Sequence, residues 1–369
     1  MRLIAKNVIK SYKGYKPLCY INAEEVLVFK QMRFYIFSLQ KEEFDYLCDL
    51  PANIKCRMLS KLRICQRIFR LEPRTAILVK ENLCLVSFSG GVYLLDIEAK
   101  NVLKVHEYRE GMSNVLSFTK ISNLRTVDDG IYYGDYFTNS YKEPVGIYKY
   151  NEKQGIFKQI FKFSQGEINH IHQIVEDKCR DRVWIFTGDS GDAAAIWYTE
   201  DNFKSINKIL GQSQLYRACK AFVVEKGLIY ATDTPLEQNY IRLLKIKDSE
   251  IEEQNLAEIN GSSVYGTYVG GKFIWSTTVE PQNGEKSKLL HLLSYRRGLG
   301  IKTWNSEVIE YDYKNKSIQV VNSYKKDIYP MGLCQLGSVM FIENEFQSGR
   351  LISYGSALKK IDNVMMVRQ

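Results

Sequence analysis

Two of the four histidines in this 369-residue chain are separated by a single residue, at His170 and His172. On a β-strand, residues two apart project to the same side, so both imidazoles would face one surface. An imidazole titrates near neutral pH, which makes either ring a candidate general base. We expect chemistry without a cofactor, with a divalent metal held by the pair and a carboxylate as the alternative. A third interpretation is that the rings only form structural hydrogen bonds.

Carboxylates and a guanidinium follow the histidine pair along the chain. Asp189 lies in a Gly-Asp-Ser-Gly-Asp turn, where an Asp side chain either contacts a substrate or caps its own backbone. Arg217 carries the planar fork that binds a carboxylate through two hydrogen bonds, although an ion pair between neighbouring sheets would use the same group. Asp233, in Thr-Asp-Thr-Pro, is either a substrate ligand or a turn cap. These side chains form one site only if the fold brings them together.

Short strands must position these side chains. Aromatic residues make up 12% of the chain, and they suit a pleated, half-buried sheet surface. Read with a period of two, the chain divides into sets of four short strands. The clearest set comprises residues 170–177, 183–188, 195–199 and 206–210. Similar sets comprise residues 216–224, 228–232, 241–246 and 255–259; 69–79, 83–88, 92–96 and 102–108; and 116–127, 131–136, 146–150 and 156–163.

Three further sets extend the repeat over residues 264–319, 17–50 and 331–351, with residues 2–9 supplying the strand that the last set lacks. Four-stranded units in series predict an all-β fold, the β-propeller. We count seven blades, with six or eight as alternatives, in a single domain of residues 1–369 whose ring is closed by the N-terminal strand. A pair of β-sandwiches is the rival, but it requires a central linker, and no segment rich in Pro, Gly or Ser lies there. Residues 52–67 are expected to form a short helix between blades.

A propeller would gather residues that are remote in sequence. Because its strands alternate in direction, the start of each innermost strand and the end of the second strand lie on one face, beside the central channel. The candidate catalytic residues on that face are His170, His172, Tyr216 and Asp189. The candidate substrate-binding residues are Arg217, Asp233, Asn239, Asp135, Asn139, Glu280 and Arg70.

Composition excludes several other classes of protein. The net charge of +9 comes from scattered basic residues, which indicates a solvated basic surface and no nucleic-acid partner. The eight cysteines form no C-x-x-C pair and indicate buried thiols. Lys6 interrupts the N-terminus before an apolar segment forms, and no run approaches the roughly 18 apolar residues of a membrane span. We therefore expect a cytoplasmic protein without a membrane span.

Two stretches resemble known propellers. Asp boxes have the form S-x-D-x-G-x-T-W, and residues 199–205 keep the hydroxyl and the Asp at Thr199 and Asp201, with Phe203 in place of glycine. Residues 69–281 are similar to bacterial glycosyl hydrolase or BNR-repeat proteins of polysaccharide metabolism, and Arg70 lies in a variant of the sialidase F-R-I-P signature. The motifs of that stretch include Arg109-Glu-Gly-Met, Tyr133-Gly-Asp-Tyr, His170-Ile-His, Thr232-Asp-Thr-Pro and Thr277-Thr-Val-Glu-Pro. The chain thus resembles the sialidase-like superfamily of BNR or Asp-box propellers, which implies a carbohydrate ligand.

Two functions remain open. In the first, the protein acts on an acidic saccharide at the channel mouth, as a lyase or a glycoside hydrolase. One histidine is then the base, Arg217 holds the substrate carboxylate, and Tyr216 transfers a proton. In the second, the same face is non-catalytic and binds a saccharide or a protein partner. The chain has no Walker-type loop and no G-x-S-x-G motif, which argues against nucleotide hydrolysis and serine esterase chemistry.

Overall fold

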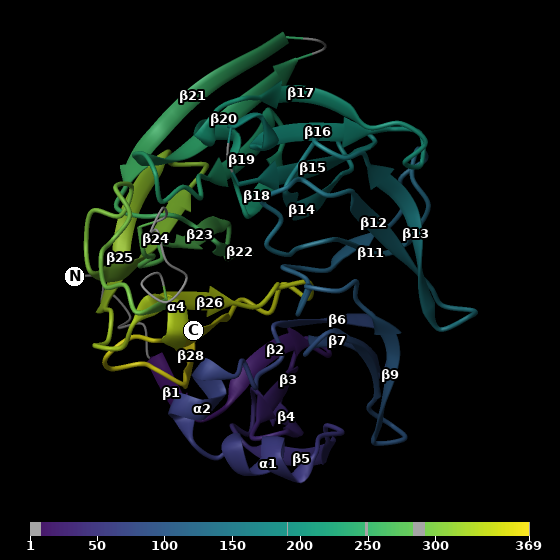
Figure 1. Ribbon diagram of the computed structural model, residues 1–369, viewed down its shortest axis with the longest axis vertical. Coiled ribbons are helices and arrows are strands. Elements are labelled where there is room, and N and C mark those ends of the chain that lie inside the picture. Colours follow the sequence, from purple (N-terminus) through teal and green to yellow (C-terminus); the bar gives the residue numbers. More distant parts are fainter. Residues whose placement is uncertain (1–8, 190, 248–249, 283–291, 369) are drawn as a thin grey trace, which may run out of the picture. The chain divides into compact units, whose positions relative to one another are not determined.

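The computed structural model describes residues 9–189, 191–247, 250–282 and 292–368 (Figure 1). These residues form seven four-stranded antiparallel sheets. The fold is therefore the predicted all-β, seven-bladed β-propeller and not a pair of sandwiches. The chain divides into two compact units. Unit 1 comprises Met1–Glu72 and Tyr265–Gln369, and unit 2 comprises Pro73–Val264.

Unit 2 contains four sheets, each built from four strands that are consecutive in sequence. The first two sheets are β6 (Thr75–Lys80), β7 (Leu83–Phe88), β8 (Gly91–Asp96) and β9 (Asn101–Glu107), and then β10 (Thr119–Ile121), β11 (Gly130–Gly134), β12 (Val145–Asn151) and β13 (Ile156–Phe163). The next two are β14 (His170–Asp177), β15 (Arg182–Gly188), β16 (Ala195–Thr199) and β17 (Asn207–Gly211), and then β18 (Lys220–Val224), β19 (Gly227–Ala231), β20 (Asn239–Lys247) and β21 (Glu250–Ile259).

The sheet of β14 to β17 agrees with the predicted strand set to within one residue at every boundary. Both faces of β14 and β15 are buried, so nearly every position in these two strands is apolar or otherwise paired. Agreement is poorer at 69–79 and 116–127, where the strands begin only at Thr75 and Thr119. In the first case, a helix occupies the residues immediately before the expected strand.

Unit 1 contains the remaining three sheets. Two of them are β2 (Lys16–Tyr20), β3 (Glu25–Lys30), β4 (Arg33–Ser38) and β5 (Phe44–Asp49), and β22 (Tyr265–Val269), β23 (Lys272–Ser276), β24 (Asn305–Asp312) and β25 (Ser317–Lys325). The third has the order β1 (Ile9–Lys13), β28 (Val364–Arg368), β27 (Leu351–Ser356) and β26 (Ser338–Phe341). The N-terminal strand therefore completes the C-terminal sheet, as predicted. It lies later than expected, because β1 begins at Ile9 and residues 2–8 lie outside the described residues.

The helices are short. The basic segment 52–67 forms two of them, α1 (Ile54–Leu59) and α2 (Arg63–Ile68), where one was expected. Asn53 caps α1 by accepting a hydrogen bond from the Cys56 backbone amide. A third helix, α4 (Met331–Cys334), replaces the start of the strand set expected at 331–351. None of the helices among the described residues has both the length and the apolar character needed to cross a bilayer.

The turn between β16 and β17 contains residues 199–205, the stretch that resembles an Asp box. Asp201 accepts hydrogen bonds from the Thr199 hydroxyl at 3.0 Å and from the Ser205 hydroxyl at 2.6 Å. Phe203, at the position of the motif's glycine, has a left-handed φ of 61°. Its ring is buried and stacks on Tyr132 at 5.4 Å. Burial of this ring therefore offsets the backbone strain that glycine would avoid.

Candidate functional site

The two histidines lie at the start of β14, the innermost strand of its sheet, which packs against β10, β11 and β18. The pairing of β14 with β15 shifts register between Ile171 and Gln173, so His172 has no partner on β15. Such a bulge redirects a side chain locally. It brings His170 Nε2 to 2.9 Å from His172 Nε2.

The surroundings of His170 set its tautomer. Its Nδ1 lies 3.0 Å from the backbone carbonyl of Phe137, which can only accept, so Nδ1 carries a hydrogen. In the neutral ring, Nε2 then presents a lone pair toward His172. The Tyr136 ring packs 4.6 Å from the His170 ring and further restricts it. This arrangement, a ring nitrogen anchored by a carbonyl behind it, is common for metal-ligating histidines.

His172 is held by close packing. Its side chain is 1% exposed, and a Cβ at Gly188 would lie 2.3 Å from the His172 Cε1 atom, so only glycine fits there. Burial lowers the pKa of His172, which keeps the ring neutral at neutral pH. Its Nδ1 is buried and has no hydrogen-bond partner among the described residues.

Asp189, immediately after β15, is the accessible member of the cluster. Its Oδ1 lies 3.2 Å from His170 Nε2, 3.6 Å from His172 Nε2 and 3.0 Å from Arg217 Nη2. The side chain is 44% exposed, whereas that of His170 is 6% exposed. Partial burial would raise the pKa of Asp189, but the neighbouring imidazoles and the Arg217 charge hold it well below its usual range. Asp189 is therefore a carboxylate at any physiological pH.

The sheet of β18 to β21 supplies the basic side of the cluster. Arg217 precedes β18, and its Nη1 donates to the Asp189 carbonyl at 3.0 Å. Its Nε lies 3.5 Å from Asp233 Oδ2, and the Cys219 thiol donates to the same oxygen at 3.1 Å. Asp233 follows β19 and is 4% exposed. We call His170, His172, Asp189, Arg217 and Asp233 the histidine cluster.

The histidine cluster follows the geometric rule expected from the sequence. His170 opens one innermost strand and Arg217 precedes the next, whereas Asp189 and Asp233 each follow a second strand. Cys219, read from the sequence only as a buried thiol, also reaches this site. The sequence carried no local signal for it, because its neighbours come from other segments.

Several other candidates lie elsewhere. The Tyr216 hydroxyl donates to Glu253 on β21 at 2.9 Å, toward the outer strand of its sheet. Asn239, at the start of β20, and Asn139, in a loop, are buried, and their side-chain oxygens accept from the Thr234 and Glu143 backbone amides respectively. Two further candidates, Glu280 and Arg70, belong to unit 1, where Glu280 accepts from the Thr278 hydroxyl and Arg70 donates to the Gly332 carbonyl.

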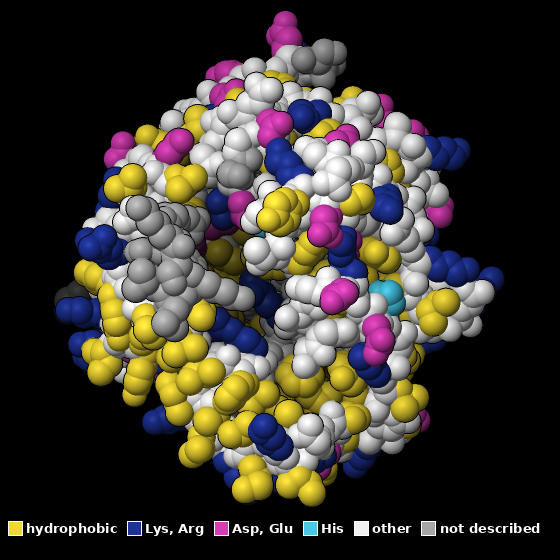
Figure 2. All heavy atoms as spheres, viewed as in Figure 1, with side chains coloured by type: hydrophobic (Ala, Val, Ile, Leu, Met, Phe, Trp, Pro, Cys, Tyr) yellow, Lys and Arg dark blue, Asp and Glu magenta, His cyan; other side chains and the backbone are white. Residues whose placement is uncertain are grey.

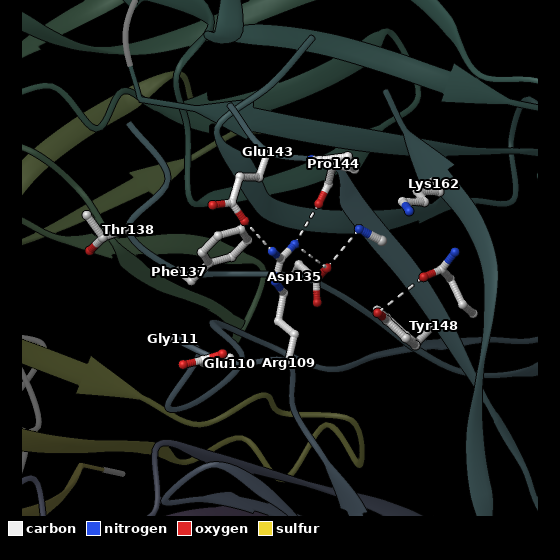
Figure 3. Close-up of a pocket in the computed structure, with 12 residues that line it drawn as sticks. Arg109, Glu110, Gly111, Asp135, Phe137, Thr138, Glu143, Pro144, Tyr148 and Lys162 are labelled. Carbon is white, nitrogen blue, oxygen red and sulfur yellow. Dashed lines mark hydrogen bonds and ion pairs between the residues drawn. The ribbon is translucent and has the colours of Figure 1, made fainter. Parts of the chain in front are cut away.

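Asp135 lines a different feature of unit 2, a polar pocket of about 500 Å³ (Figure 3). Arg109 crosses this pocket with its guanidinium 4.1 Å from the Phe137 ring centroid and donates to Glu143 at 2.6 Å. Asp135 Oδ2 accepts from the Gly146 amide at 2.8 Å and lies 4.0 Å from Arg109 Nη1. Burial raises the pKa of Asp135 to about 6, an effect that Gly146 and Arg109 reduce. Phe137 links the two features, because its carbonyl also meets His170.

The donor set of the cluster suits a divalent metal. One ligand atom from each of His170, His172 and Asp189 lies within 4.8 Å of the others, and a second such group comprises His172, Cys219 and Asp233. Ligands bound at about 2.1 Å around a tetrahedral ion lie roughly 3.4 Å apart. The separations of 2.9, 3.2 and 3.6 Å in the first group bracket this value. Two imidazoles and a carboxylate are also ordinary ligands.

The sequence matches no protein-family model and no curated protein. Among solved structures, the chain is similar to an oligogalacturonate lyase in complex with manganese, with 9% identity, a TM-score of 0.56 and coverage of 98% of this chain and 90% of that one. An oligogalacturonate lyase from Vibrio parahaemolyticus is 10% identical, with a TM-score of 0.57 and coverage of 98% and 91%. The AfRom2 CNH domain is 5% identical, with a TM-score of 0.54 and coverage of 100% and 98%. At these identities the likeness defines the fold class, a β-propeller.

Proposed function

We propose that the protein is a lyase that cleaves an acidic saccharide at the histidine cluster. The observation that carries this proposal is the convergence of two imidazoles and a guanidinium on one exposed carboxylate, Asp189. Elimination beside a uronate carboxylate needs positive charge to stabilise the developing anion and a group that accepts the α-proton. Both kinds of group are present. Two of the solved structures similar to this chain are oligogalacturonate lyases, which supports the same reaction class.

Elimination fits the cluster better than hydrolysis does. Glycoside hydrolases use two carboxyl groups, one of which must be protonated to act as the acid. Asp189 is held ionised by its imidazole and guanidinium neighbours, so it does not serve as that acid.

Asp135, whose pKa is raised to about 6, lies in the pocket of Figure 3 with Arg109. We therefore propose that the pocket binds sugar units away from the cleaved bond.

A divalent metal belongs to the proposal, since the cluster fits one and one of the similar structures is a manganese complex. His170 Nε2, His172 Nε2 and Asp189 Oδ1 would hold the ion, and the bound metal would supply Lewis acidity toward a substrate carboxylate. Arg217 holds Asp189 in place and adds positive charge beside the open side of the cluster. Without a metal, the lone pair on His170 Nε2 would accept the α-proton. With the metal bound, that lone pair would be a ligand, and the second carboxylate oxygen of Asp189, Oδ2, would accept the α-proton.

The test is turnover of oligogalacturonate, followed by the ultraviolet absorbance of the unsaturated product, with Mn²⁺ and with a chelator. We expect activity with Mn²⁺ and its loss in His172→Gln. His106→Asn is the matched control, because His106 lies in unit 2 and its ring nitrogen Nε2 contacts the Tyr133 hydroxyl, outside the cluster. Activity that survives chelation but not His172→Gln would assign the pair to proton transfer, and activity in His172→Gln would refute the site.

A second candidate function is binding without catalysis, at the same face, of a saccharide or a protein. The burial of His170 and His172 favours it, because neither ring is open to a large substrate. It predicts a thermal shift with oligogalacturonate and no ultraviolet product.

We also propose a single domain over residues 1–369 and a cytoplasmic location. The eight free cysteines support a reducing compartment.

A further inference from the structure

The helical segment between β5 and β6 has an unusual composition. Residues 51–71 contain no Asp or Glu, although acidic residues are frequent in the rest of the chain. The basic residues of the segment are Lys55, Arg57, Lys61, Arg63, Arg67 and Arg70. The proposed lyase reaction makes no use of this segment, which belongs to unit 1.

Three of the arginines point into unit 1 and hold the helices in place. Arg57 pairs with Asp49 at 2.6 Å, and Arg63 pairs with Glu72 at 3.0 Å. Arg67, whose side chain is only 2% exposed, pairs with Asp327 at 2.5 Å. These ion pairs fix the side of the segment that faces the protein, and therefore also the side that faces outward.

The outward side carries large apolar residues. Ile54 and Met58 lie four residues apart on α1, and Leu62 immediately precedes α2; the three are 77%, 66% and 58% exposed. Phe69 is 56% exposed, and Ile328, beside the Arg67 partner Asp327, is 70% exposed. Figure 2 shows hydrophobic side chains gathered over the region of α1 and α2. A group of large, exposed apolar side chains on a protein surface marks an interaction site.

Lysines alternate with these apolar residues. Lys55 and Lys61 are exposed, and neither forms an ion pair with any described residue. Exposed apolar side chains interleaved with unpaired basic residues, on short helices, are typical of segments that lie in the interface of an anionic bilayer. A second copy of the chain fits less well, because a symmetric contact would bring the same lysines together.

We propose that the surface formed by Ile54, Lys55, Met58, Lys61 and Leu62 docks on an anionic membrane surface. The apolar side chains enter the boundary between headgroups and acyl chains, and the two lysines meet the headgroup charge. This docking is independent of the saccharide proposal, since it uses other residues in the other compact unit.

The test is cosedimentation of the full chain with vesicles of phosphatidylcholine and phosphatidylserine, against vesicles of phosphatidylcholine alone. We expect binding to the anionic vesicles that weakens as salt is added. Lys55→Gln with Lys61→Gln should weaken it by about 25-fold, because each basic residue near the surface contributes about five-fold. Ile54→Asn with Met58→Gln and Leu62→Gln should abolish it.

The matched control substitutes exposed apolar residues of unit 2, Leu103→Gln with Ile156→Gln and Leu236→Gln, and should bind as the unsubstituted chain does. All variants change exposed side chains, so their thermal unfolding should not change, and this is measured in parallel. Absence of binding, equal binding to both vesicle types, or equal loss in the unit 2 control would overturn the proposal. So would light scattering that showed a dimer dissociated by the Ile54, Met58 and Leu62 substitutions.

Discussion

Replacing Arg217 by Met tests whether the histidine cluster is held together by its guanidinium. The substitution keeps most of the side-chain volume and removes the charge that lies 3.0 Å from Asp189 Oδ1 and 3.5 Å from Asp233 Oδ2. The Asp233 side chain is 5% exposed, so among the described residues its carboxylate would keep only the weak Cys219 thiol donor. Breaking a buried pair in this way costs about 3 to 5 kcal/mol.

The ion pair of Arg217 with Asp189 contributes less to the free energy of unfolding than the pair with Asp233. Because its side chain is 44% exposed, solvent screens the pair, and its loss is worth at most about 1 kcal/mol. We therefore expect Arg217→Met to lower the free energy of unfolding by about 3 to 5 kcal/mol, mostly through Asp233. Urea denaturation monitored by tryptophan fluorescence measures it.

A double-mutant cycle separates the two carboxylates. Asp233→Asn removes the buried negative charge, so it should restore most of the stability lost in Arg217→Met, whereas Asp189→Asn should restore little. A loss below about 1 kcal/mol in Arg217→Met, or Asp233→Asn effects that simply add to it, would refute the view that Asp233 needs this cation.

Three more outcomes follow from the site and the turn. A Mn²⁺ concentration of 100 times the dissociation constant should stabilise the chain by about 2.7 kcal/mol in thermal unfolding; an unchanged transition, or an equal shift in His172→Gln, would contradict metal binding at the pair. Asp135 has a pKa of about 6 in the folded protein and an ordinary value of 3.8 in the unfolded chain. Its stabilising effect is therefore present below pH 3.8 and disappears as the pH rises through 6. Relative to Asp135→Asn, the free energy of unfolding of the native chain should therefore fall by about 3 kcal/mol between pH 3.8 and pH 6, as measured by urea titrations. If the free energies of unfolding of the two proteins changed with pH in parallel, the prediction would be contradicted. Phe203→Gly relieves the positive φ but removes a buried ring, and should cost about 2 to 4 kcal/mol in the same assay; a stabilised variant would show that strain outweighs packing.

The fold class was predictable because its signal is local and repeated. Short runs bounded by turn residues, such as 170–177 and 195–199, predict strands, and both ranges are strands in the structure. The predicted strand boundaries were wrong where a segment with strand propensity forms a helix. Residues 331–334 are apolar enough for a strand, yet they form α4, which packs against α2.

The sequence by itself determined the strand sets, the turn at Asp201 and the candidacy of His170, His172, Asp189 and Arg217. Only the tertiary structure decided which candidates meet. Tyr216 and Arg217 are adjacent in the chain, but the Tyr216 side chain reaches Glu253 on β21, whereas the Arg217 side chain reaches Asp189, which follows β15 of another sheet. These distances depend on how the strands pack, which no local pattern encodes.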